Sequence, residues 1–223
     1  MEIFMDHDFW HQKWKNNEIG FHREEINEFL QKYYPLNQLP STTKVFVPLC
    51  GKSIDMLWLN QRGAQVVGSE LSLLACQQFF VENNLEMESS QSGEFVQLKH
   101  NSIELLSGDF FKLTLAELGN IDFCYDRAAL VALPAKLRIQ YAHKMAELLP
   151  AGALYLLITY NYGGDSAFGP PFSVDSNEVV KLFGDNFTIT FLEQQVEDSN
   201  NLPALAKRGI AQVINQVYML KRK

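Results

Sequence analysis

The chain contains 223 residues, of which 47% are hydrophobic and 20% are charged. This length and composition are typical of one globular domain, so we expect residues 1–223 to fold as a single unit. The formal net charge of -7 disfavours a nucleic-acid partner, because a protein that neutralises phosphates needs a basic surface.

The cysteines and the apolar runs exclude further classes of protein. Cys50, Cys76 and Cys124 are odd in number and far apart, so neither a disulfide framework nor a metal site is predicted. Unpaired cysteines are typical of a reducing compartment, and the apolar run from Ala153 to Thr159 is too short to span a bilayer. The polar, aromatic N-terminus is unlike a signal peptide. We therefore expect a cytoplasmic protein without a membrane partner, and a monomer because no exposed apolar stripe stands out.

Two helices are predicted before the first strand, at residues 7–15 and 22–33. From residue 45 onward, short apolar runs alternate with helical segments. The predicted strands cover residues 45–49, 66–70, 95–98, 103–106, 121–126, 153–160, 187–196 and 210–220, with the third and fourth forming a hairpin. The predicted helices cover residues 53–62, 72–82, 135–148 and 175–183, with Ser53 and Ser72 as N-caps.

Alternating strands and helices are typical of an α/β fold with a doubly wound, Rossmann-like, mostly parallel sheet. The last two strands have no helix between them, which predicts an antiparallel pair at one edge. Residues 41–223 are therefore expected to form the core, with residues 1–40 as a helical appendage. Ligands of such sheets bind at the carboxyl ends of the strands.

The first candidate site combines the turn after the first strand with the end of the second strand. Gly51 lets the backbone approach a ligand closely because it has no Cβ atom. Glu70 follows 19 residues later, where an acid can accept hydrogen bonds from both hydroxyls of a ribose. The alternative is a solvated carboxylate at a strand end.

Two other nucleotide-binding motifs are excluded by residues in the same region. Gly51-Lys52-Ser53 resembles the end of a Walker A loop, but Phe46 occupies the position of its first glycine. No Gly-x-Gly-x-x-Gly sequence is present to receive the pyrophosphate of a dinucleotide. These absences favour a ligand that contains adenosine but no phosphates.

Arg127 belongs to a second candidate site, at the end of the strand predicted at residues 121–126. Its guanidinium suits contact with a cofactor or orientation of an anionic acceptor. The alternative is a surface salt bridge between Asp126 and Arg127.

Aromatic residues near the N-terminus form a third candidate site. Trp10 and Trp14 share one helical face, and Phe21 follows them. They either pack on the sheet or form a lid that closes over a cofactor and excludes water, and an indole face suits a sulfonium cation. Further on, Gly169-Pro170-Pro171-Phe172 predicts a rigid turn that suits the wall of an acceptor pocket.

In combination these motifs resemble the thiopurine S-methyltransferases, particularly their short bacterial members. The resemblance extends in order over nearly the whole chain, and its most specific element is the Pro-Leu-Cys-Gly-Lys turn, since most methyltransferases of this fold carry a Gly-x-Gly loop instead. The matching stretches are Phe9-Trp10 with Trp14, Gly20-Phe21-His22, Val47 to Ser53, Val67 to Leu71, Tyr125 to Leu130 and Gly169 to Phe172.

The resemblance implies a class I methyltransferase fold with a seven-stranded sheet, an N-terminal helical lid, and S-adenosylmethionine as cofactor with S-adenosylhomocysteine as product. It implies that Arg127 is catalytic and lies beside both cofactor and acceptor. The implied cofactor-binding residues are Trp10, Trp14, Leu49, Gly51, Glu70, Leu71, Asp109, Phe110 and Arg127. The implied acceptor-binding residues are Phe21, Pro171, Lys207 and Arg208, the last two in place of an acceptor-side arginine of the mammalian relatives.

The implied reaction is methyl transfer to the sulfur of a thiopurine or of another aromatic or heterocyclic thiol, by in-line displacement. One alternative keeps the cofactor and takes chalcogen, halide or thiocyanate anions as acceptors, since bacterial members of the family are associated with tellurite and selenium detoxification. A nucleic-acid methyltransferase is disfavoured by the acidic charge and because Tyr125-Asp126-Arg127-Ala128 differs from the Asn/Asp-Pro-Pro-Tyr/Phe motif of amine methylation. A binding module without activity is the remaining alternative.

Overall fold

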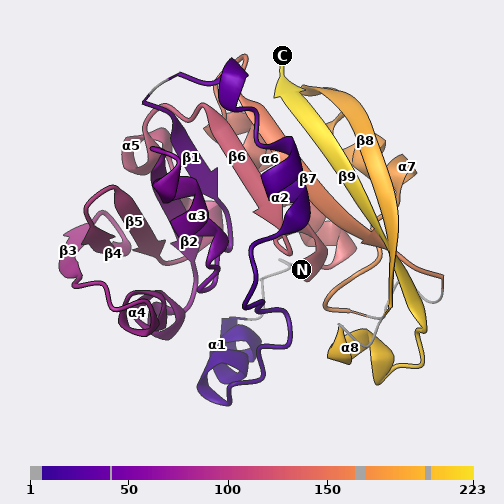
Figure 1. Ribbon diagram of the computed structural model, residues 1–223, viewed down its shortest axis with the longest axis horizontal. Coiled ribbons are helices and arrows are strands. Elements are labelled where there is room, and N and C mark those ends of the chain that lie inside the picture. Colours follow the sequence, from indigo (N-terminus) through magenta and orange to yellow (C-terminus); the bar gives the residue numbers. More distant parts are fainter. Residues whose placement is uncertain (1–6, 41, 164–168, 199–201) are drawn as a thin grey trace. The chain divides into compact units, whose positions relative to one another are not determined.

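The computed structural model describes residues 7–40, 42–163, 169–198 and 202–223 (Figure 1). The chain divides into two compact units, and the division falls within strand β6 (Phe123–Arg127). The first unit comprises Asp6–Tyr125, and the second is built from Asp126–Lys223. No helix of the described residues is long and apolar enough to cross a bilayer.

A parallel sheet forms the centre of the first unit. Its strands β5 (Ile103–Ser107), β2 (Gln65–Glu70), β1 (Lys44–Val47) and β6 lie in that order (Figure 1). β1 pairs in parallel with both β2 and β6, and β2 pairs in parallel with β5. Helices connect these strands because parallel neighbours need a crossover. The parallel arrangement predicted for this part of the chain is confirmed.

An antiparallel extension continues this sheet beyond β5. β4 (Phe95–His100) and β5 form the predicted hairpin, with Asn101 at a φ of 50° in its turn. β3 (Glu88–Ser92) adds a further antiparallel strand that was not predicted. Its sequence, ESSQS, is almost fully exposed and therefore has no apolar alternation. The described residues hold nine strands, of which eight correspond to strands predicted from the sequence pattern and β3 is the addition; the resemblance had implied a sheet of seven.

The helices of the first unit begin where capping groups are available. The helices are α1 (His7–Lys15), α2 (Glu28–Tyr33), α3 (Asp55–Gln61), α4 (Leu73–Glu82) and α5 (Leu115–Leu118), with 3-10 turns η1 (Leu36–Gln38) and η2 (Phe110–Lys112). Ser72 caps α4 as predicted, since its hydroxyl accepts the Ala75 N–H. Two predictions were wrong. α2 begins six residues later than expected because Asn27 caps it by accepting the Leu30 N–H, and α3 has Ile54 rather than Ser53 at its N-cap position.

The second unit contains three strands in the order β7 (Leu154–Asn161), β9 (Gln212–Arg222) and β8 (Phe187–Asp198). β9 is antiparallel to both neighbours, which confirms the predicted antiparallel pair. The helices of this unit are α6 (Ala135–Leu148), α7 (Ser176–Phe183) and α8 (Pro203–Ala206), preceded by the 3-10 turn η3 (Leu130–Ala132). α6 coincides with its predicted range.

Candidate functional site

The Glu70 carboxylate closes the turn that follows β1. One of its oxygens, Oε2, accepts the N–H of Gly51 at 2.9 Å, and Oε1 accepts the N–H of Ser72 at the same distance. The Cys50 N–H donates to the carbonyl of Ser69 at 2.8 Å, which joins the two strand ends a second time. The carboxylate therefore holds together the two segments that the sequence placed at one rim of the sheet.

Glu70 is buried, with 7% of its surface exposed. Burial raises the pKa of its carboxyl above the usual range, although N–H donors from Ser72, Gly51 and Leu71 lower it in part. A carboxylate has about four lone-pair sites, so Glu70 has acceptor capacity beyond these backbone donors. The alternative of a solvated carboxylate is wrong, because water reaches little of this side chain.

The turn between β1 and α3 contains two residues in the left-handed region, Leu49 at a φ of 46° and Gly51 at 53°. The conformation is ordinary for glycine but strained for leucine. A Cβ atom added to Gly51 would lie 3.0 Å from Cζ2 of Trp14. The turn thus depends on glycine both for its φ angle and for the close approach of an indole ring.

The aromatic residues near the N-terminus form one cluster over this turn. Trp14 is buried, whereas Trp10 and Phe21 are half-buried. The Phe21 ring makes edge-to-face contacts with Trp14 and Trp10, at centroid distances of 5.5 and 5.9 Å. Helix α1 and the segment that follows it therefore carry a wall of rings beside Gly51.

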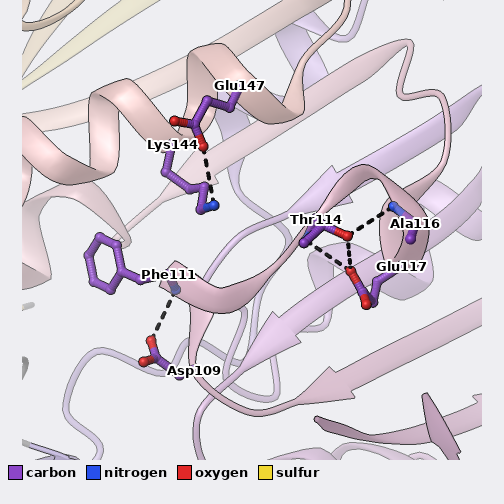
Figure 2. A network of polar contacts seen from close by, with 7 residues as sticks. All are labelled: Asp109, Phe111, Thr114, Ala116, Glu117, Lys144 and Glu147. Atoms are coloured by element: carbon purple, nitrogen blue, oxygen red, sulfur yellow. Dashed lines mark hydrogen bonds and ion pairs between the residues drawn. The ribbon is translucent and has the colours of Figure 1, made fainter. Parts of the chain in front are cut away.

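Asp109 and Phe110 follow β5, the next strand along the sheet. The Gly108 N–H donates to the Glu70 carbonyl at 2.9 Å, so this segment lies against the end of β2. Asp109 accepts the Phe111 N–H at 3.0 Å through Oδ1 (Figure 2). Phe110 is buried. Beyond them Thr114 and Glu117 form a capping box at the start of α5, which fixes the end of the segment (Figure 2). Leu71 is half-buried directly after Glu70.

In the second unit, Arg127 ends β6 and is half-buried. Its neighbour Asp126 is fully buried and accepts hydrogen bonds from the hydroxyls of Tyr141 and Tyr155, each at 2.6 Å, and from the Leu130 N–H. Burial raises the pKa of the Asp126 carboxyl, although these donors oppose the rise. A surface salt bridge between Asp126 and Arg127 was one expectation, and it is wrong because this carboxylate lies in the core.

The Gly169–Phe172 turn is bound by two side chains of the same unit. Arg208 donates to the Gly169 carbonyl at 3.1 Å and approaches the Pro170 carbonyl at 3.5 Å. The Tyr162 hydroxyl donates to the Pro171 carbonyl at 2.7 Å. Two predicted acceptor-binding residues, Pro171 and Arg208, therefore belong to one hydrogen-bonded cluster, whereas Lys207 is exposed.

Sequence reasoning missed several buried polar residues that fix these segments. They are Asp55, Ser72 as a donor to Glu70, Tyr141, Tyr155 and Tyr162. The only local signal was the acid two residues after Ser53, at the start of a predicted helix. No group of three or more His, Cys, Asp and Glu side chains able to hold a metal occurs among the described residues.

The buried thiols are poor candidates for chemistry. Cys50 and Cys76 lie near Glu70, and burial raises the pKa of both well above the usual value for cysteine. A thiol held protonated is a weak nucleophile. The first unit therefore offers a site for binding rather than for covalent catalysis.

A model of the thiopurine S-methyltransferase family matches residues 5–223. A thiopurine S-methyltransferase of Shewanella baltica (strain OS155) is 44% identical over 219 residues, which cover 98% of this chain and all of that protein. The solved structure of a SAM-dependent methyltransferase from Anabaena variabilis is 13% identical, with a TM-score of 0.63, covering 99% of this chain and 96% of that one.

A second solved structure is phosphoethanolamine N-methyltransferase 2 of Haemonchus contortus in complex with S-adenosyl-L-methionine. It is 10% identical, with a TM-score of 0.62, and the match covers 99% of this chain and 60% of that one. At such low identity these likenesses concern the fold, which is the mixed α/β fold of the class I methyltransferases, as predicted.

Proposed function

This chain belongs to the thiopurine S-methyltransferase family and is an S-adenosylmethionine-dependent S-methyltransferase, and we propose that its acceptor is the sulfur of a thiopurine or of another aromatic or heterocyclic thiol. The observation that carries the cofactor side is the buried Glu70 carboxylate on the Gly51 N–H. The acceptor is inferred from the names of the relatives.

The residues of the first unit fit an adenosyl ligand without phosphates. The Glu70 oxygens accept the N–H groups of Gly51 and Ser72, and the acceptor capacity that remains suits the hydroxyls of a ribose. Gly51 presents backbone without a Cβ atom, and the turn lacks the glycines that a pyrophosphate needs. We assign the ribose to Glu70 and the amino-acid end of the cofactor to the Gly51 turn.

Apolar and aromatic side chains of the first unit complete the proposed cofactor site. Leu49 and Leu71 are half-buried at the ends of β1 and β2, and Asp109 and Phe110 occupy the corresponding place after β5, where an adenine would bind. Trp10 and Trp14 are assigned to the sulfonium side, because an indole face attracts a cation. In this proposal residues 1–40 form the lid, and its closure excludes water.

The proposed acceptor-binding residues come from the aromatic segment near the N-terminus and from the second unit. Arg127 stabilises the anionic form of the acceptor and adjoins the cofactor. Pro171 contributes a rigid wall, Phe21 an aromatic contact, and Lys207 and Arg208 positive charge that attracts an anion. In this proposal the partner is a small molecule, and neither a nucleic acid nor a membrane takes part. We expect the chain to act as a monomer in the cytoplasm.

The reaction requires little of the protein beyond holding the methyl donor and the acceptor sulfur in position. When bound, S-adenosylmethionine supplies an electrophilic methyl group, and the acceptor sulfur forms a bond to that carbon as the bond to the cofactor sulfur breaks. Acidic thiols lose their proton to water, so the chain needs no strong base. Holding the two reactants aligned is worth up to about 7–11 kcal/mol. Arg127 adds electrostatic stabilisation of the thiolate.

The test is an assay of the purified chain with S-adenosylmethionine and 6-mercaptopurine, following S-adenosylhomocysteine and the methylated purine. We expect equal amounts of both products from the wild type and about a hundredfold lower activity, at subsaturating cofactor, from Glu70→Ala. A parallel assay with selenite and tellurite tests the other acceptors. Cofactor binding without turnover of any thiol, or faster turnover of a chalcogen anion, would overturn the proposed acceptor.

A further inference from the structure

Asp55 is a buried carboxylate that binds three separate segments of the first unit. It is 2% exposed, at the first residue of α3. Its Oδ1 accepts the backbone N–H of Asn27 at 2.9 Å, and its Oδ2 accepts the hydroxyls of Tyr125 at 2.9 Å and of Ser53 at 3.2 Å. One side chain therefore receives donors from positions 28 and 70 residues away as well as from its own turn.

Each of the three donors adjoins a part of the proposed active site. Asn27 caps α2 and ends the segment that carries Trp14 and Phe21. Ser53 lies two residues after Gly51, whose N–H is bound to Glu70. Tyr125 lies two residues before Arg127 in the same strand. Asp55 thus joins the base of the aromatic segment to the turn that Glu70 closes.

The donors to Asp55 come from segments that adjoin the proposed site, whereas the tyrosine donors to Asp126 lie in the core of its own unit. A carboxylate removed from water loses several kcal/mol of hydration, and hydrogen bonds from neutral donors restore only part of it. An apolar side chain of similar volume would fill the same space without that loss. What a carboxylate offers, and an apolar group does not, is a fixed geometry among three donors.

We propose that Asp55 is a positioning residue, which holds the aromatic segment of residues 7–26 in place over the Gly51 turn and thereby sets the affinity for the cofactor. This inference rests on the proposed function, because it concerns the same cofactor site. Asp55 itself does not contact Glu70 in the hydrogen bonds described above. Its effect passes through Asn27 on one side and Ser53 on the other.

The test compares Asp55→Asn with Asp122→Asn as a matched control. Asp122 is half-buried and accepts the Lys44 N–H at 2.8 Å, at the opposite end of β1 from the Gly51 turn. An asparagine keeps the volume of the side chain, but its amide nitrogen cannot accept a hydrogen bond from Tyr125 or Ser53. Affinity for S-adenosylhomocysteine is measured by calorimetry, and kcat and KM for 6-mercaptopurine are measured at saturating cofactor.

We expect Asp55→Asn to weaken S-adenosylhomocysteine binding about tenfold, the size of one lost hydrogen bond to a charged group. The same variant should leave kcat at saturating cofactor within about threefold of the wild type. General unfolding would lower kcat as well as cofactor affinity, so the difference between the two distinguishes the proposed role. Asp122→Asn should change the affinity less than twofold. In a Trp58→Phe background, acrylamide should quench Trp10 and Trp14 more strongly in Asp55→Asn, because the aromatic segment is no longer held.

Unchanged affinity and quenching in Asp55→Asn would overturn the inference, as would equal losses of affinity in Asp55→Asn and Asp122→Asn. If Asp55→Asn does not fold, Tyr125→Phe and Ser53→Ala each remove one donor and are expected to weaken binding about threefold; wild-type affinity in both would overturn it as well. A wild-type chain that binds no S-adenosylhomocysteine would instead refute the proposed cofactor site.

Discussion

Two of the predicted strands end in an acid, and in the structure these two carboxylates have different surroundings. Glu70 ends β2, remains 7% exposed, and accepts backbone N–H groups from the adjoining turns. Asp126 lies in β6, is fully buried, and accepts the hydroxyls of two tyrosines from α6 and β7. Burial raises the pKa of both.

The difference separates a group that suits ligand binding from a group that suits stability. Backbone donors at Glu70 fix a turn, and 7% of the side chain remains exposed. At Asp126, two tyrosine hydroxyls and the Leu130 N–H, all from its own unit, hold the carboxylate within the core. An acid after an apolar strand is therefore not enough to predict a binding residue, because the donors around it decide its role.

The greatest loss of stability is expected at Asp126. Asp126→Ala removes the acceptor of two buried tyrosine hydroxyls and should lower the free energy of unfolding by about 3–5 kcal/mol. Tyr141→Phe, which removes one donor, should cost about 1 kcal/mol. Urea denaturation followed by circular dichroism measures both. A loss under 1 kcal/mol for Asp126→Ala would contradict the structural role.

The next effect concerns Arg127, the neighbour of Asp126 on the same strand. Arg127→Ala should lower kcat/KM for 6-mercaptopurine about thirtyfold, roughly 2 kcal/mol of electrostatic stabilisation. Affinity for S-adenosylhomocysteine should change less than threefold, because Glu70 and the Gly51 turn remain. Arg127→Lys keeps the charge and should recover part of the rate. An equal loss of cofactor affinity would assign Arg127 to cofactor binding alone.

Stability and cofactor affinity should depend on pH in different ways through the Glu70 carboxyl. Its folded-state pKa is raised, so its contribution to stability is present below the unfolded pKa and is lost as pH rises through the folded pKa. Cofactor affinity should instead fall as the pH is lowered. Below the folded-state pKa, where the carboxylate is protonated, it should weaken about tenfold per pH unit. Calorimetry at several pH values checks this, and Glu70→Gln should show no such slope. A wild-type affinity independent of pH would contradict the ribose role.

A smaller effect is expected at Gly51. Gly51→Ala places a Cβ atom 3.0 Å from Trp14 at a φ of 53°, so both strain and displacement of the indole follow. Gly63→Ala is the matched control, because Gly63 has a φ of 86° with nothing within 4 Å of the added atom. Both should lose about 1 kcal/mol of stability. Only Gly51→Ala should weaken cofactor binding, by about fivefold, and equal affinities would show that the contact with Trp14 has no role.

The sequence predicted most of the fold because apolar runs mark the buried strands directly. β2, α4 and α6 lie at or within one residue of their predicted ranges. β3 was missed because its side chains are exposed and polar, and a strand of that kind is defined by pairing rather than by its own pattern. The start of α2 was misplaced because apolar spacing continued through Ile26 before the Asn27 cap.

The candidate site was predictable only where local connectivity brings residues together. Gly51 and Glu70, which are 19 positions apart, meet because they belong to one unit of strand, turn, helix and strand. The hydroxyls on Asp126 come from residues 15 and 29 positions away, and the donor that Tyr125 supplies to Asp55 spans 70 positions. Contacts of that range depend on how whole elements pack, and a single sequence carries no signal for them.

In the proposed site, Glu70 holds the ribose hydroxyls of the cofactor. The direct measurement is a double-mutant cycle by calorimetry, in which S-adenosylhomocysteine and its 2′,3′-dideoxy analogue are each titrated into the wild type and Glu70→Gln. We expect removal of the hydroxyls to weaken binding about a hundredfold in the wild type and less than fivefold in Glu70→Gln. The same loss in both proteins would show that the hydroxyls bind elsewhere and would refute the role of Glu70.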